Sequence, residues 1–207
     1  SRTYLDDNNE QGSKHAAQMV AAGIVPDKFN TPKLDAVLQY IEDVLSEDPK
    51  NKVVLFSFFK NNLRLIQQAT KHLTNGVLFM GGMTTEERDA SKQRFSTDPN
   101  TRLFLSSDAG GYGVDLPVAN YLISYDLPWS AGKLDQREAR IIRLSSEFPH
   151  VNIVSFVMKG SIEERQYEML QEKRNINKAF VDGGYDPKGS FQLNLGALST
   201  FLSTSEV

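Results

Sequence analysis

Short apolar runs alternate along the chain with longer segments whose apolar positions recur at three- and four-residue spacing. The runs cover residues 53–58, 77–80, 103–106, 121–125 and 151–157, and they stay apolar on successive positions, as strands buried on both faces do. Helical patterns cover residues 31–45, 63–72, 84–95 and 161–180. Strands of this kind alternating with helices predict an α/β domain of three layers, in which helices flank a mostly parallel sheet.

Capping signals predict where three of these helices begin. Thr31, which is followed by proline, is an N-cap candidate for the first helix. Thr84 with Glu87 three residues later predicts a capping box, and Ser161 with Glu164 predicts a second one.

Composition changes at both ends of the chain. Residues 1–30 are polar with only brief apolar pieces, which predicts an N-terminal arm. Residues 31–184 carry the strand and helix pattern and are expected to form the folded domain. Residues 185–207 turn rich in glycine, serine and threonine, and we expect a tail there with a short helix over residues 193–202.

Composition also excludes several classes of protein. Cysteine is absent from the 207 residues, and His15, His72 and His150 lie far apart, so neither a thiolate site nor a metal site is predicted. A net charge of −3 argues against a protein that coats nucleic acid by neutralising its phosphates, so any such contact must be local. No apolar stretch is long enough to predict a membrane span or a signal peptide, and the expected compartment is the cytoplasm or the nucleus.

A glycine-rich segment follows the third predicted strand. It reads SSDAGGYGVDL over residues 106–116 and places Gly110, Gly111 and Gly113 in one turn, where a backbone without Cβ atoms can approach a ligand closely. A tight connection from strand to helix is the alternative interpretation, and the segment does not decide between the two by itself.

An arginine-bearing segment, LDQREARIIRL, covers residues 134–144. Arg137, Arg140 and Arg143 recur every three residues and would share one side of a helix. An amphipathic surface helix with a basic stripe is one interpretation. The other is anion recognition, because converging guanidinium groups can neutralise the charge on a transferring γ-phosphoryl group.

The two segments together resemble motifs V and VI of superfamily 2 helicases, of the Swi/Snf type. Gln136, Arg137, Arg140 and Arg143 match the Q-R-x-x-R-x-x-R arrangement of motif VI. Residues 52–59 resemble motif IV, residues 81–95 the segment after it, residues 125–129 the turn between motifs V and VI, and residues 159–174 the helix that braces the lobe. The resemblance covers residues 32–184, with the motifs in the family's order.

The resemblance implies a second, RecA-like helicase lobe that faces ATP. It assigns a catalytic role to Arg143, as arginine finger, and to Arg140 beside it on the phosphates. It assigns nucleotide contacts to Gly111, Gly113, Asp115, Gln136 and Arg137. Asp115 stands where the family usually has asparagine, and Ala139 and residues 144–146 also depart from the usual motif VI, which blurs the subfamily and the substrate.

The resemblance further implies a track for nucleic acid, expected to be double-stranded DNA, held by contacts to phosphates. Lys60, Thr84, Ser106 and Ser107 are the candidates for these contacts. Each has a simpler interpretation: Thr84 as an N-cap, Lys60 as a solvated charge, and the two serines as turn formers.

Neither a G-x-x-x-x-G-K-[ST] phosphate loop nor an acidic D-E-x-x box occurs in these residues. In this family both belong to the first lobe, which would hold most of the ATP and its Mg²⁺. The first residue is Ser1 and the first methionine is Met19, so we expect a piece of a longer protein that hydrolyses no ATP in isolation. Two alternatives stay open: a degenerate lobe that only binds nucleic acid or protein, and a Rossmann-like enzyme, which the glycine spacing disfavours.

Overall fold

The computed structural model describes residues 31–108, 114–142 and 148–181. The predicted N-terminal arm and the predicted helix at residues 193–202 lie outside the described residues. Gly111, Gly113 and Arg143 lie outside them as well.

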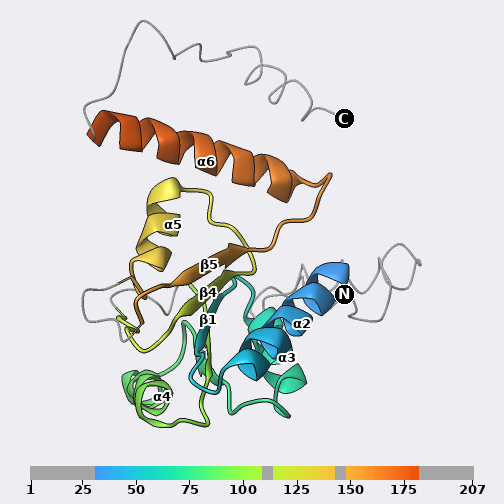
Figure 1. Ribbon diagram of the computed structural model, residues 1–207, viewed down its shortest axis with the longest axis vertical. Helices are drawn as coiled ribbons and strands as arrows, with labels where there is room; N and C mark the ends of the chain where they lie inside the picture. The colour runs from blue at the N-terminus through green and yellow to red at the C-terminus, as the bar shows by residue number, and fades with distance from the viewer. Residues whose placement is uncertain (1–30, 109–113, 143–147, 182–207) are drawn as a thin grey trace, which may run out of the picture. The chain divides into compact units, whose positions relative to one another are not determined.

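Five strands form one sheet in which every neighbouring pair is parallel (Figure 1). The strands are β1 (Val53–Phe56), β2 (Val77–Phe79), β3 (Leu103–Ser106), β4 (Tyr121–Ser124) and β5 (Asn152–Ser155), in the order β2-β3-β1-β4-β5. The first strand in sequence is therefore the central one, with Val54 opposite Phe104 on one side and Leu122 on the other. The predicted parallel sheet is confirmed.

Helices and ordered loop segments cover both faces of the sheet (Figure 1). The described helices are α2 (Pro32–Glu47), α3 (Lys60–Ala69), α4 (Thr85–Thr97), α5 (Ala131–Glu138) and α6 (Ile162–Val181). α2 and α3 lie on one face of the sheet and α4 on the other, whereas α5 packs with the first part of α6. Val53 and Leu55 pack against buried residues of α2 and α3, while Val54 and Phe56 pack on the other face with Phe95 of α4. The alternation of side chains along β1 thus supplies two cores and confirms the three-layer architecture.

All three predicted cap residues accept a hydrogen bond at the start of their helix, and Ser161 accepts from the Glu163 amide at 3.2 Å. Thr31 accepts a hydrogen bond from the Leu34 amide at 3.2 Å, and both bonds of the Thr84–Glu87 capping box are formed. The box predicted at Ser161 is wrong in its partners, because the Glu164 carboxylate accepts from the Gly160 amide at 2.7 Å instead of from Ser161. Gly160 has a φ of 73°, and this left-handed turn presents its N–H to the start of α6.

The first compact unit of the chain ends at Leu170, within α6. In this unit Leu170 packs with Leu127, Ala131 and Leu134, so the first part of α6 covers α5. Gln166 also donates a hydrogen bond to the Leu127 carbonyl at 2.8 Å. None of the described helices combines the length and apolar character needed to cross a bilayer.

Candidate functional site

The glycine-rich and arginine-bearing segments meet at the carboxyl edge of the sheet. β1, β3 and β4 are parallel and in register, so the residues that follow Phe56, Ser106 and Ser124 emerge at the same edge. This edge is where ligands bind in open parallel sheets, and it contains the described candidates for nucleotide contact.

Arg137 joins the two segments. Its Nε and Nη2 atoms donate to the two carboxylate oxygens of Asp108 at 2.7 and 2.8 Å, and Nη1 donates to the Asp126 carbonyl at 2.6 Å. The guanidinium also lies 5.3 Å from the Phe56 ring centroid, and only 2% of the side chain is exposed. Arg137 therefore holds the start of the glycine segment against α5, and its predicted contact with nucleotide stays a prediction.

Arg137 and Arg140 do not lie on one continuous α-helix, but both guanidinium groups lie on the same side, against the Phe56 ring, at 5.3 and 5.6 Å from its centroid. α5 ends at Glu138, and Arg140 lies in the turn that follows. The Arg140 carbonyl accepts a hydrogen bond from the Leu116 amide at 2.9 Å, and Ile141 is fully buried in the core. After α5 the chain therefore runs towards the glycine segment, where it is held by burial of Ile141 and by the bond between Leu116 and Arg140.

Three further candidates for ATP contact differ in how far they are exposed. Asp115 and Gln136 are exposed, one next to Leu116 and the other next to Arg137. The Arg140 guanidinium lies 5.6 Å from the Phe56 ring centroid and is partly buried. The roles predicted for these residues stay predictions. No group of three potential metal ligands occurs in the described part of the chain.

The two serine candidates for nucleic-acid contact are buried, with exposed fractions of 1% for Ser106 and 3% for Ser107. The Ser106 hydroxyl donates to the Ser107 carbonyl, and the Ser107 hydroxyl accepts from the Gly81 amide, both at 3.2 Å. Their hydroxyls thus shape the turns after β3 and β2. The alternating pattern of the sequence could not show this, because it does not reveal which loops pack on one another.

Lys60 and Thr84 are the accessible pair among these candidates. Lys60 is the first residue of α3 and is partly exposed, and Thr84 is the exposed N-cap of α4. A Cβ atom built on Gly82 would lie 3.9 Å from the Lys60 Nζ atom, so the ammonium reaches the turn that leads to Thr84. The structure brings these two residues to one surface.

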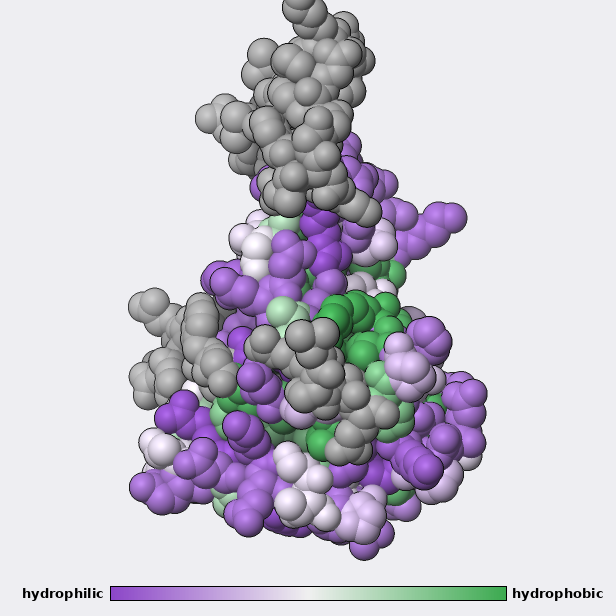
Figure 2. All heavy atoms as spheres, turned by 60° about the vertical axis from the view of Figure 1, so that its left-hand side comes forward, coloured by the Kyte–Doolittle hydropathy of each residue, from purple (hydrophilic) through white to green (hydrophobic). Residues whose placement is uncertain are grey.

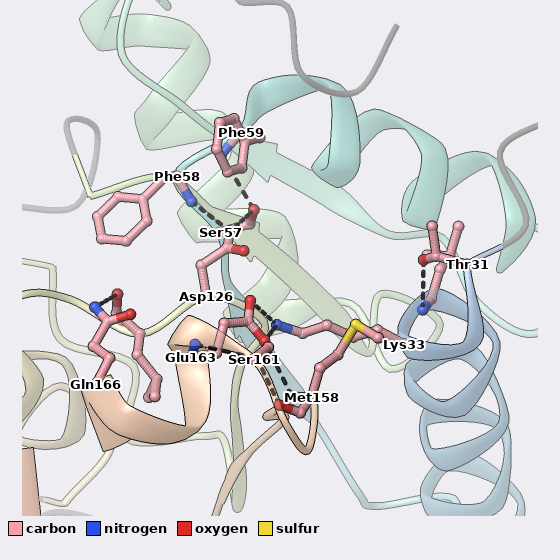
Figure 3. Close-up of polar contacts among 12 residues, drawn as sticks. Thr31, Lys33, Ser57, Phe58, Phe59, Asp126, Met158, Ser161, Glu163 and Gln166 are labelled. Atoms are coloured by element: carbon pink, nitrogen blue, oxygen red, sulfur yellow. Dashed lines mark hydrogen bonds and ion pairs between the residues drawn. The ribbon is translucent and has the colours of Figure 1, made fainter. Parts of the chain in front are cut away.

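Sequence reasoning missed a cluster of charged residues beneath this edge (Figure 3). Lys33 of α2 binds both carboxylate oxygens of Glu163 at 2.6 and 2.8 Å, and Asp126 accepts hydrogen bonds from the Ser57 hydroxyl and from the Phe58 amide. Burial raises the pKa of Asp126 above its ordinary value, although these hydrogen bonds and the nearby Lys33 ammonium act in the opposite direction. The available signal was the position of Lys33, four residues before Val37 on the apolar face of α2.

Comparison with known proteins agrees with this geometry. Residues 32–145 match the family described as the helicase conserved C-terminal domain. The chain belongs to that family. It is the second, RecA-like lobe of a superfamily 2 protein of the Swi/Snf type, as the relatives below also indicate.

One relative of this helicase lobe is the DNA repair protein RAD5 of Cryptococcus neoformans. It is 32% identical over 165 residues, which cover 78% of this chain and 14% of the relative. The lobe therefore spans a small part of such a relative's length.

Two solved structures are similar to the lobe. The C-terminal part of the Fun30 ATPase domain superposes with a TM-score of 0.63 at 22% identity, over 76% of this chain and 52% of the other. The Sulfolobus solfataricus SWI2/SNF2 ATPase core in complex with dsDNA gives a TM-score of 0.59 at 26% identity, over 74% and 32%.

Proposed function

We propose that this lobe supplies motifs IV, V and VI of an ATP-dependent DNA translocase, including the arginine finger. The observation that carries the proposal is the joining of motifs V and VI at the carboxyl edge of the sheet, through the Asp108–Arg137 pair and the Leu116–Arg140 bond. These contacts place Arg140 beside the glycine segment.

ATP fits the donor chemistry of this edge. Arg140 and Arg143 would meet the phosphates, while Asp115 and Gln136, both exposed, would line the rest of the nucleotide together with Gly111 and Gly113. ATP bound with Mg²⁺ supplies the phosphoryl group that water attacks, and guanidinium groups neutralise the charge that spreads over its oxygens. The first lobe of the same polypeptide would supply the phosphate loop and the Mg²⁺ ligands.

Duplex DNA is the proposed track. The archaeal SWI2/SNF2 core at 26% identity was solved in complex with dsDNA, and Lys60 and Thr84 form an accessible pair on this lobe. Direct phosphate contact is proposed for Lys60 and Thr84, whereas the buried Ser106 and Ser107 would act by shaping the loops beside them.

Part of the surface of this lobe is hydrophobic (Figure 2), as expected for a domain that contacts a second lobe. Phe58 and Phe59 after β1, and Trp129 after β4, are large apolar residues with 39%, 41% and 62% exposure. They follow strands that end at the edge proposed to face ATP.

The deciding experiment measures DNA-stimulated ATP hydrolysis by the full-length protein. Arg143→Ala is expected to lower turnover on the order of a thousandfold, and Arg140→Ala to lower it strongly as well. Lys133→Ala, which changes an exposed residue of α5, is the matched control and should leave turnover unchanged. Wild-type turnover in Arg143→Ala would instead favour a degenerate lobe that only binds.

A binding measurement tests the track. Lys60→Ala in the full-length protein is expected to weaken DNA binding equally for all sequences. The slope of log K for DNA binding against log salt concentration should fall in magnitude by about one. An unchanged slope would remove Lys60 from the track.

A further inference from the structure

Asp126 accepts hydrogen bonds through its side-chain carboxylate and through its backbone carbonyl, and the two groups bind different parts of the lobe. The carboxylate accepts hydrogen bonds from the Ser57 hydroxyl and from the Phe58 amide, at 3.1 Å for the amide, which ties it to the end of β1. The backbone carbonyl accepts the Nη1 hydrogen bond of Arg137 at 2.6 Å. The side-chain bonds therefore determine where this carbonyl lies.

The Lys33–Glu163 ion pair closes over the same residue (Figure 3). It joins α2 to the start of α6 across 130 positions of sequence, and the Lys33 side chain is only 7% exposed. The Lys33 ammonium also lies 5.0 Å from the ring centroid of Tyr125, the residue before Asp126. Among the described residues, Lys33 from α2 and Glu163 from α6 are thus the charged groups that act on the Asp126 carboxylate, which also accepts hydrogen bonds from Ser57 and the Phe58 amide.

Direct contacts connect this ion pair to the proposed ATP edge. Lys33 contacts Tyr125, Asp126 binds Arg137, and Arg137 binds Asp108 at the start of the glycine segment. Arg137 donates from all three guanidinium nitrogens along this path, so a shift of the Asp126 carbonyl would change where the guanidinium lies.

We propose that Asp126 is a positioning residue for ATP hydrolysis. It fixes the carbonyl that orients Arg137, and through Lys33 and Glu163 it couples the start of α6 to motifs V and VI. This inference rests on the proposed function of the lobe, but its structural part can be tested separately.

The test compares Asp126→Ala with Asp126→Asn in the full-length protein. Alanine removes the acceptor for Ser57 and Phe58, whereas asparagine retains a carbonyl oxygen of similar reach. We expect Asp126→Ala to lower kcat for DNA-stimulated ATP hydrolysis about tenfold or more, with little change in the KM for ATP, because misplacement affects the reacting geometry. Asp126→Asn should recover most of this loss.

Equal kcat in wild type and Asp126→Ala would overturn the positioning role. A loss of kcat that asparagine does not recover, in protein that is fully folded at the assay temperature, would also overturn it, because the carboxylate charge would then be what matters.

The coupling to α6 has its own variants. Glu163→Gln and Lys33→Met are each expected to lower kcat, and each should add little when combined with Asp126→Ala, since they act through the same contact path. Glu168→Gln, at an exposed position of α6, is the matched control. Fully additive effects of Lys33→Met and Asp126→Ala would contradict the coupling.

Amide hydrogen exchange tests the positioning role of Asp126 separately from the proposed function of the lobe in ATP hydrolysis. If Asp126 positions Arg137, exchange in α5 and at Leu116 should accelerate in Asp126→Ala and not in Asp126→Asn. If this pattern appears while Arg143→Ala leaves ATP hydrolysis intact, the proposed function fails and the positioning contact stands. An unchanged exchange pattern in Asp126→Ala would overturn the positioning contact itself.

Discussion

Arg137 and Asp108 meet through two side-by-side hydrogen bonds, from Nε to Oδ1 at 2.7 Å and from Nη2 to Oδ2 at 2.8 Å. Such fork-to-fork geometry is typical of arginine with a carboxylate or a phosphate. It ties Arg137 to the start of the glycine segment, while Arg140 and Arg143 are the residues proposed to face the ATP phosphates.

Removal of Asp108 tests how much this pair stabilises the lobe. Asp108→Ala leaves the Arg137 charge without its carboxylate, and the Arg137 side chain is only 2% exposed. We expect the free energy of unfolding to fall by about 3 kcal/mol, the low end for a buried pair, because Asp108 itself is 22% exposed. Urea denaturation measures the difference. Lys133→Ala on α5 should change it by less than about 0.5 kcal/mol, and an equally small effect of Asp108→Ala would show that the pair contributes little.

The raised pKa of Asp126 predicts a pH dependence of stability. A carboxyl group whose pKa is higher in the folded state binds its proton more tightly there, so folding is penalised once the pH exceeds the ordinary aspartate pKa of about 3.9. The penalty grows until the pH passes the raised folded value and is constant above it. Asp126→Asn cannot lose a proton, so its stability relative to wild type should rise across this window. Thermal unfolding at pH 3.5 and at pH 7 checks the sign, and a constant difference would contradict it.

Variants of Thr84 distinguish a role in helix capping from a role in DNA contact. Its hydroxyl accepts a hydrogen bond from the Glu87 amide at 3.2 Å, and the Glu87 carboxylate accepts one from the Thr84 amide at 2.8 Å. Thr84→Ala should lower the free energy of unfolding by about 1 kcal/mol, while Thr84→Ser should retain it. DNA affinity measured on the same variants should follow the hydroxyl if Thr84 contacts a phosphate. Loss of stability without loss of affinity would leave Thr84 as a cap alone.

Arg102 stabilises the end of a helix to which it does not belong. It donates to the Leu45 and Asp48 carbonyls at 2.7 and 2.6 Å and to the Asn51 carbonyl at 3.1 Å, at the C-terminus of α2. α2 has no basic residue in its own last turn, so this cation also meets the negative end of the helix dipole. Arg102→Met should lower the free energy of unfolding by about 2 kcal/mol. Lys50→Ala, nearby and exposed, is the comparison that should show almost no change.

The sequence predicted the fold well because its signals were local. The apolar runs at β1, β3 and β4 and the Thr84–Glu87 box each depend on a few neighbouring residues, and the structure contains all of them. The mostly parallel sheet could be predicted because strands buried on both faces need helices on both sides.

The site was harder to predict because its contacts join distant residues. Three-residue spacing suggested one helical face for Arg137 and Arg140, yet α5 ends at Glu138 between them, and it is the Phe56 ring that both guanidinium groups contact. Lys33 and Glu163 pair across 130 positions of sequence, and this pairing has no counterpart in any local pattern. Burial of Ser106 and Ser107 likewise depends on how separate loops pack.

The central place of β1 has a consequence for synthesis on the ribosome. Both of its neighbours, β3 and β4, are translated later, so the apolar segment VVLF emerges before any strand that can cover its edges. Until Leu103 leaves the exit tunnel, neither edge of this segment can pair with its native neighbour, although α2, α3 and α4 can already cover its faces. Translation pauses placed before β3 should therefore increase aggregation of the nascent chain more than pauses placed after β4.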